Sequence, residues 1–279
     1  MRARAKKPSG SKIHLLHPLE SLGLVHIGRG EVRVEPLQDR IVPRVPFPHR
    51  HDFVQLVVIE KGRGWHEIDF NRYKVKASQA YLIKPGQVHG WSLVSAKGFV
   101  VEFTHETIEA NASSALPDCF DIDAADIFPL LRLMQAEFRE RQKGFELNLV
   151  DLLRAALRML ERRAGGSRER GEESLALRFQ SLVDGNFRSE RRVEFYADRL
   201  KLTPKALTMR MTRALGKSAR EVILDRVLLE SKRMLAYSEA SVVEIAEVLG
   251  FEDANYFSRF FRESAGASPS VFREKAKRP

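Results

Sequence analysis

Two segments in the last hundred residues of the chain repeat one pattern about 50 residues apart. The segment VEFYADRLKLTPKALTMRMTRALG begins at Val193, and VVEIAEVLGFEDANYFSRFFRESAG begins at Val242. In each of them, apolar residues recur at helical spacing on both sides of a short break. The pattern predicts a helix, a sharp turn and a second helix, the plan in which the second helix enters the major groove of DNA.

Sequence signals mark the ends of these helices. Thr203-Pro204 combines an N-cap residue with a proline at the first helical position, and Ser268-Pro269 repeats that signal. Gly216 is the last residue of the first repeat, where a glycine ends a helix. Between the repeats, AREVILDRVLLESKRMLAYS predicts one long helix over 219–238. We therefore expect two helix-turn-helix motifs joined by a long helix.

The charge is concentrated at the two ends of the chain. Residues 175–279 contain 20 Lys/Arg and 14 Asp/Glu, which gives a net charge of +6, and residues 1–12 contain five Lys/Arg and no acid. The rest of the chain is nearly neutral. A basic helical domain favours a polyanionic partner, with double-stranded DNA first and a membrane surface second.

The first part of the chain has the pattern of a β domain. Short apolar runs, rich in Val, Ile and Phe, alternate with turn signals such as KGRG, FNRY and KPGQ; the runs are LGLVHI, FVQLVVIE, WHEIDF, AYLI and GFVVEF. Regularly spaced short strands of this kind predict a sandwich or a barrel.

Two amphipathic helices are expected after these strands, within 126–163. Two sets of apolar residues share a helix face: Leu130, Leu133, Met134 and Phe138 in one, and Leu149, Leu152, Leu153, Ala156, Leu157 and Leu160 in the other. These faces would either cover an open side of the barrel or pair with a second subunit, and both roles are compatible.

The stretch AGGSRERGEES at 164–174 is the predicted linker, because almost none of it is apolar. We predict a basic tail at 1–12, a β domain with flanking helices at 13–163, and an all-α domain at 175–279. The fold class is α+β. The single cysteine, Cys119, excludes an intramolecular disulfide and indicates a reducing compartment, the cytoplasm. No apolar run is long enough to span a membrane.

The C-terminal hundred residues resemble the AraC/XylS family of transcription regulators. The matching residues are Gly250-Phe251, Tyr256-Phe257, Phe261, Gly266, Pro269 and Phe272-Arg273. The first repeat departs from the family pattern, with Lys201 where a glycine is usual and Met211 where an aromatic residue is usual. The resemblance implies a sequence-specific DNA-binding regulator.

The candidate DNA-reading residues lie opposite the apolar face of each second helix. They are Lys205, Thr208, Met209 and Thr212 in the first repeat, and Asn255, Ser258, Arg259 and Arg262 in the second. Asn pairs with adenine and Arg with guanine, whereas Met209 has no donor and offers apolar contact, for instance to a thymine methyl. We place Arg262 nearer the phosphates.

The N-terminal part resembles the cupin-type sensor domain of such regulators. The matching residues are His49-Arg50-His51, Gly62, Gly64 and Pro85-Gly86-Gln87-Val88-His89. Metal-binding cupins carry a glutamate where this chain has Gln55, and a neutral amide is a weaker ligand for a cation, so we expect no metal and no other cofactor. The candidate effector-binding residues are His49, His51, Gln55, Trp65, His89 and Trp91. The effector class that this resemblance suggests is an aromatic acid.

Three functions compete on these grounds. The favoured one is a dimeric, effector-responsive transcription regulator that has no catalytic residues and contacts RNA polymerase if it is an activator. The alternatives are a cupin metalloenzyme fused to a DNA-binding domain, and an architectural DNA-binding protein with an idle barrel. The enzyme needs a complete set of metal ligands, which Gln55 interrupts, and no phosphate-binding loop or nucleophile elbow is present.

Overall fold

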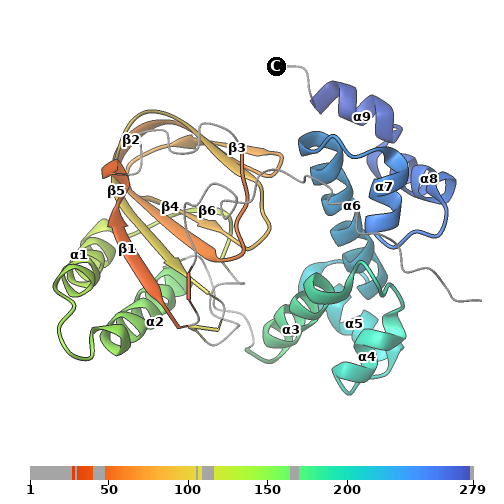
Figure 1. The fold of residues 1–279 in the computed structure, drawn as a ribbon. Coiled ribbons are helices and arrows are strands. Elements are labelled where there is room, and N and C mark those ends of the chain that lie inside the picture. The colour runs from red at the N-terminus through yellow and green to blue at the C-terminus, as the bar shows by residue number, and fades with distance from the viewer. Residues whose placement is uncertain are drawn as a thin grey trace, which may run out of the picture. The chain divides into compact units, whose positions relative to one another are not determined.

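The computed structural model describes residues 27–28, 30–39, 48–104, 106–108, 116–163 and 170–276, with the backbone alone at 170–174. The predicted tail at 1–12 and the start of the β domain lie outside these residues. The described chain contains strands first and then helices, as expected (Figure 1). It divides into two compact units, the first ending at Arg226 and the second beginning at Val227. The predicted domain boundary at 164–174 stays a prediction.

In the described part of the chain, six strands form one antiparallel sheet. Its order is β1-β5-β2-β4-β6, and β3 pairs with β2. The strands are β1 (Val32–Pro36), β2 (Val54–Ile68), β3 (Asn71–Val75), β4 (Gln79–Ile83), β5 (His89–Phe103) and β6 (Cys119–Asp121), with a short 3-10 turn, η2, at Leu37–Asp39. All five pairings are antiparallel.

The prediction that the stretch KGRG forms a turn is wrong. It lies inside β2, which joins two of the predicted strands into one and pairs along its length with β5. The ladder is interrupted by irregularities between Ile59 and Lys61 and between Arg63 and Gly64. Gly64 has a φ of 141°, and a Cβ there would collide with the carbonyl oxygen of Ser92. The glycines therefore serve a bulged strand rather than a chain reversal.

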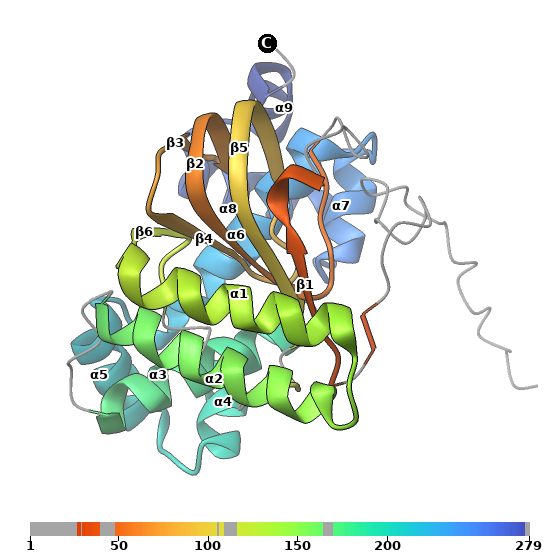
Figure 2. The same ribbon diagram turned by 90° about the vertical axis from the view of Figure 1, so that its left-hand side faces the viewer.

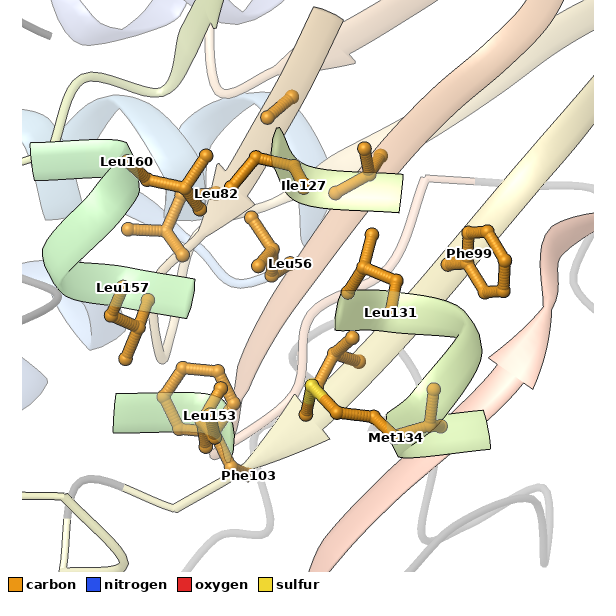
Figure 3. Packing of buried hydrophobic residues seen from close by; sticks show 14 of the residues in the cluster. Leu56, Leu82, Phe99, Phe103, Ile127, Leu131, Met134, Leu153, Leu157 and Leu160 are labelled. Carbon is orange, nitrogen blue, oxygen red and sulfur yellow. The ribbon is translucent and has the colours of Figure 1, made fainter. Parts of the chain in front are cut away.

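Two helices, α1 (Ala124–Glu140) and α2 (Phe145–Arg163), cover one face of the sheet (Figure 2). The carboxylate of Asp123 caps α1 by accepting a hydrogen bond from the Ala125 amide at 3.0 Å. Leu131 and Met134 of α1, and Leu153 and Leu157 of α2, are fully buried against the strands (Figure 3). Each such side chain stabilises the fold by about 1.5–3 kcal/mol.

The predicted face of α1 is therefore wrong in part. Leu133 is 50% exposed, and Ile127, Phe128 and Leu131 are the buried residues that accompany Met134. The predicted face of α2 is confirmed, except that Leu152 is only partly buried. Because this face packs on the sheet, covering the sheet is the role that the structure gives to α2.

The other face of the sheet encloses a second cluster of buried side chains. The sheet is curled, as the ribbon in Figure 1 shows. The buried residues are Leu37, Val57, Ile59, Ile68, Val75, Tyr81, Ile83 and Val100, and Trp91 and Tyr73 pack against them. Of the candidate effector residues, Trp91 packs against this cluster.

Seven helices follow in the described residues. They are α3 (Arg170–Asn186), α4 (Val193–Arg199), α5 (Pro204–Leu215), α6 (Ala219–Tyr237), α7 (Val242–Val248), α8 (Ala254–Ala265) and α9 (Pro269–Ala276). The predicted helix-turn-helix motifs and the long helix between them are confirmed. Residues 170–174, the end of the stretch predicted as a linker, belong to α3. No helix in the described ranges has both the length and the apolar character needed to cross a membrane.

Candidate DNA-reading helices and candidate effector site

The first helix-turn-helix motif consists of α4 and α5. Lys201 occupies the turn with a φ of 55°, a left-handed conformation that is unusual for a residue with a side chain. Thr203 caps α5 by accepting a hydrogen bond from the Ala206 amide at 3.2 Å. Leu207 and Met211 are fully buried on the inner face of α5. The opposite face is consequently held outward.

The outward face of α5 carries the predicted reading residues. Lys205, Met209 and Thr212 are exposed, and Thr208 is half-buried. Met209 is 56% exposed. The Thr212 hydroxyl donates to the Thr208 carbonyl at 2.9 Å, so its proton is used inside the helix. Arg213, also exposed, was missed by the sequence reasoning, although its position next to Thr212 places it at the edge of this face.

The second motif consists of α7 and α8. Ser241 and Glu244 form a capping box at the start of α7. Gly250 occupies the turn with a φ of 73°, a conformation that glycine adopts readily. The carboxylate of Asp253 accepts hydrogen bonds from the backbone amides of Asn255, at 2.9 Å, and Tyr256, at 3.3 Å. These contacts fix the start of α8.

Aromatic packing holds α8 in place. Phe257 and Phe261 are fully buried, with ring centroids 6.0 Å apart, and Phe272 of α9 lies 5.4 Å from Phe261. The guanidinium of Arg273 donates from Nε to the Leu235 carbonyl at 3.3 Å, and from Nη2 to the Ala240 carbonyl. These rings therefore serve packing.

The outward face of α8 carries Asn255, Arg259 and Arg262, all exposed, with Ser258 half-buried. Tyr256 is 53% exposed on this helix, and the Arg259 guanidinium lies 5.9 Å from its ring centroid. The sequence reasoning did not single out Tyr256 as a surface residue. The sequence did contain a signal for its exposure: Tyr256 lies three residues before Arg259, and residues three apart share a helix face.

Three predicted effector residues lie together near one end of the sheet domain. His49 and His89 form an isolated β-bridge, with mutual backbone hydrogen bonds of 2.9 and 2.8 Å. The ring of His89 lies 4.3 Å from that of His49 and 5.0 Å from that of His51, between centroids. All three side chains are buried. The three histidines thus lie together in the fold.

A fourth histidine, His66 of β2, joins this group, although the sequence reasoning did not single it out. Its Nε2 lies 3.3 Å from Nδ1 of His89, and its ring stacks on Trp91 with centroids 3.4 Å apart. His66 pairs in register with Trp91 across β2 and β5. We call His49, His51, His66 and His89 the histidine group.

Burial controls the charge of His66 and His89. Desolvation lowers the pKa of His66 and of His89 well below the usual value for an imidazole, and neighbouring histidines lower the pKa further. Both rings are therefore neutral at pH 7. Nδ1 of His66 and Nε2 of His89 are buried and have no hydrogen-bond partner. Since one of the two rings must donate to the other, one of these two atoms carries a proton and the other a lone pair.

Gln55 and Trp65 have different surroundings. The Gln55 amide donates to the Glu102 carboxylate at 2.9 Å, across the register of β2 and β5. Trp65 is 39% exposed, and the Arg72 guanidinium lies 4.5 Å above its ring. The structure therefore brings Trp91 to the histidine group but leaves Trp65 at the surface. Among the described residues, no group of three or more His, Cys, Asp or Glu side chains is arranged to hold a metal ion.

A curled antiparallel sheet with helical cover, followed by two helix-turn-helix motifs, defines a class of ligand-responsive DNA-binding regulators. Residues 38–178 match the family of AraC-like ligand binding domains, and residues 196–275 match a helix-turn-helix domain family. The chain belongs to the AraC family of transcriptional regulators. It has a ligand-binding domain and a DNA-binding helix-turn-helix domain.

The chain is similar to several known proteins. The HTH-type transcriptional activator RhaS of Escherichia coli O1:K1 / APEC is 23% identical, over 92% of this chain and 96% of its own length. The structure of unsaturated-fatty-acid-bound ToxT from Vibrio cholerae is similar, with 18% identity, a TM-score of 0.42, and coverage of 87% of this chain and 94% of that one. The C-terminal domain of the response regulator YesN from Fusobacterium nucleatum is 25% identical, with a TM-score of 0.33, over 34% of this chain and 93% of that domain. None of these comparisons supports the metalloenzyme alternative.

Proposed function

We propose that the chain binds double-stranded DNA through the outer faces of α5 and α8, with a small organic effector bound near the histidine group. The observation that carries the proposal is the presence of two reading helices with buried apolar faces and exposed polar ones. In this proposal the chain has no catalytic activity of its own and acts in the cytoplasm. If it is an activator, as the relative RhaS is named, RNA polymerase is a further partner.

A binding assay with purified protein and selected DNA sites tests this proposal. We expect log affinity to fall by roughly 0.9 per neutralised phosphate for each tenfold rise in salt concentration. Arg259→Ala should lower affinity for the selected site by about 1–3 kcal/mol and relax the preference at one base pair. Arg262→Ala should weaken all sites alike. An unchanged sequence preference in Arg259→Ala would show that this face of α8 does not read bases.

The effector class that we propose is an aromatic acid, as the family resemblance suggested. Buried neutral imidazoles and the indole of Trp91 offer hydrogen bonds and ring contacts, the features that ligand sites combine. A panel of aromatic and aliphatic acids should include one that raises the melting temperature, since a ligand bound only to the folded state stabilises it. Trp91→Ala should remove that shift, and Trp65→Ala should preserve it because Trp65 lies at the surface.

We also propose that the chain forms a dimer through α1 and α2. The structure determines which residues of these helices should be substituted to test it. Leu153 and Leu157 are buried in the sheet domain, so substitutions there would destabilise the fold rather than separate subunits. Leu133 and Leu147 are 50% and 74% exposed on the same pair of helices. We expect the double variant Leu133→Lys, Leu147→Lys to be folded and monomeric by light scattering. A dimeric variant would place the interface elsewhere.

A further inference from the structure

The two reading helices present different chemistry at equivalent positions. Aligning the buried pair Leu207 and Met211 of α5 with Phe257 and Phe261 of α8 places Met209 opposite Arg259, and Thr212 opposite Arg262. One repeat thus has a guanidinium where the other has a thioether. Arg259 of α8 can donate hydrogen bonds to a base edge, whereas Met209 at the equivalent position of α5 has no hydrogen-bond donor.

The hydroxyl of Thr212 does not replace the missing donor. Its proton is directed to the Thr208 carbonyl at 2.9 Å, a bond within the helix that leaves the methyl group and the lone pairs of Oγ1 for other contacts. Met209 is 56% exposed and ends in a methyl group. The centre of the outward face of α5 is therefore largely apolar, although it lies in a basic domain.

An apolar centre restricts what α5 can recognise in the major groove. Among the four bases, only thymine presents a methyl group there, and the other edges present hydrogen-bond donors and acceptors. We infer that Met209 and Thr212 recognise thymine by contact with its 5-methyl group. The half-site read by α5 is then defined by thymine methyls, and that read by α8 by hydrogen bonds from Arg259 and Asn255.

This inference rests on the proposed DNA-binding function, and its size can be estimated. Burying one group of the size of a methyl changes affinity by about fourfold. Replacing one thymine by deoxyuridine removes only the methyl and keeps every hydrogen-bonding group. Each contacted thymine should therefore give about a fourfold loss on this replacement, and two together about fifteenfold.

The experiment measures binding of the full chain to its selected site by fluorescence anisotropy, with each thymine replaced by deoxyuridine in turn. In the wild-type chain, we expect deoxyuridine to lower the affinity about fourfold at one thymine or more. In Met209→Ala, we expect no loss of affinity at that thymine, because the methionine methyl that contacts the thymine methyl is already absent. Arg259→Ala should keep the loss. At the same position, 5-methylcytosine should bind about fourfold better than cytosine.

The control is Val243→Ala, which changes an exposed apolar residue of α7 and should keep wild-type affinity and deoxyuridine sensitivity. Wild-type melting temperature in Met209→Ala would confirm that the substitution leaves the fold intact. Deoxyuridine sensitivity that persists in Met209→Ala at every thymine where the wild-type chain shows it, or that is absent at every thymine, would overturn the inference. If a specific site is bound and Arg259 governs it, the proposed function survives that result. If no specific site exists, the proposed function fails first.

Discussion

Lys201 and Gly250 hold the same place in the two helix-turn-helix motifs, and both adopt a left-handed backbone, with φ values of 55° and 73°. Glycine adopts this conformation without steric cost, whereas lysine pays for the contact between its Cβ and the backbone. The inner faces differ as well: Leu207 and Met211 fill the first, and phenylalanine rings fill the second. The two motifs therefore have the same backbone arrangement although their turn and core residues differ. The energetic cost of the turn is higher in the first motif.

The largest expected effect tests the aromatic side of this comparison. Phe261→Ala should lower the free energy of unfolding by about 3–5 kcal/mol, because it leaves a cavity beside Phe257 and Phe272. Thermal and chemical denaturation followed by circular dichroism measure the change. Val243→Ala, at a 63% exposed position of α7, should stay within about 0.5 kcal/mol of the wild type. Equal effects of the two variants would contradict the assignment of Phe261 to the core.

A smaller effect, of opposite sign in the two motifs, is expected in the turns. Lys201→Gly should stabilise the first motif by about 1 kcal/mol, since the left-handed conformation costs a non-glycine residue that much. Gly250→Lys should destabilise the second motif by about 1 kcal/mol for the same reason. Denaturation of both variants under one set of conditions gives the pair of values. A destabilised Lys201→Gly would mean that the lysine side chain makes a contact worth more than the strain.

The smallest expected difference lies in the helix caps. Thr203→Ala and Asp253→Ala should each cost about 1 kcal/mol. The Asp253 variant should cost a few tenths more, because its carboxylate accepts from two amides and also faces the positive end of the helix. Denaturation midpoints measured at low salt reveal the difference. Asp253→Asn, which retains an acceptor, should recover most of the loss, and failure to recover would assign the effect to charge alone.

Local signals were sufficient to predict most of the helical part. The repeat, the Thr203-Pro204 cap and the glycines after α5 and α8 fix helix ends by rules that act within a few residues. The outward positions of α5 and α8 followed from the same periodicity. Arg213 and Tyr256 were missed because a periodic pattern shows which positions face outward but not how far a side chain extends.

The sheet domain was harder to predict, because its decisive contacts join residues that are distant in the chain. KGRG has the composition of a turn, and only the pairing of β2 with β5 shows that it continues a strand. His66 enters the histidine group through its register with Trp91, which no local pattern reveals. Trp65, its neighbour, points to the other side of the strand, since successive side chains alternate.

The bonds from Arg273 to the carbonyls of Leu235 and Ala240 have a practical consequence for work in cells. A nonsense mutation that deletes α9 would leave two acceptors unpaired and remove Phe272 from the ring of Phe261, so the shortened product would be a substrate for quality-control proteases. Its phenotype would then reflect a low protein level rather than altered regulation. A reporter fused after Ala276 keeps those bonds intact, and fusion at that point is the better choice for following the protein in vivo.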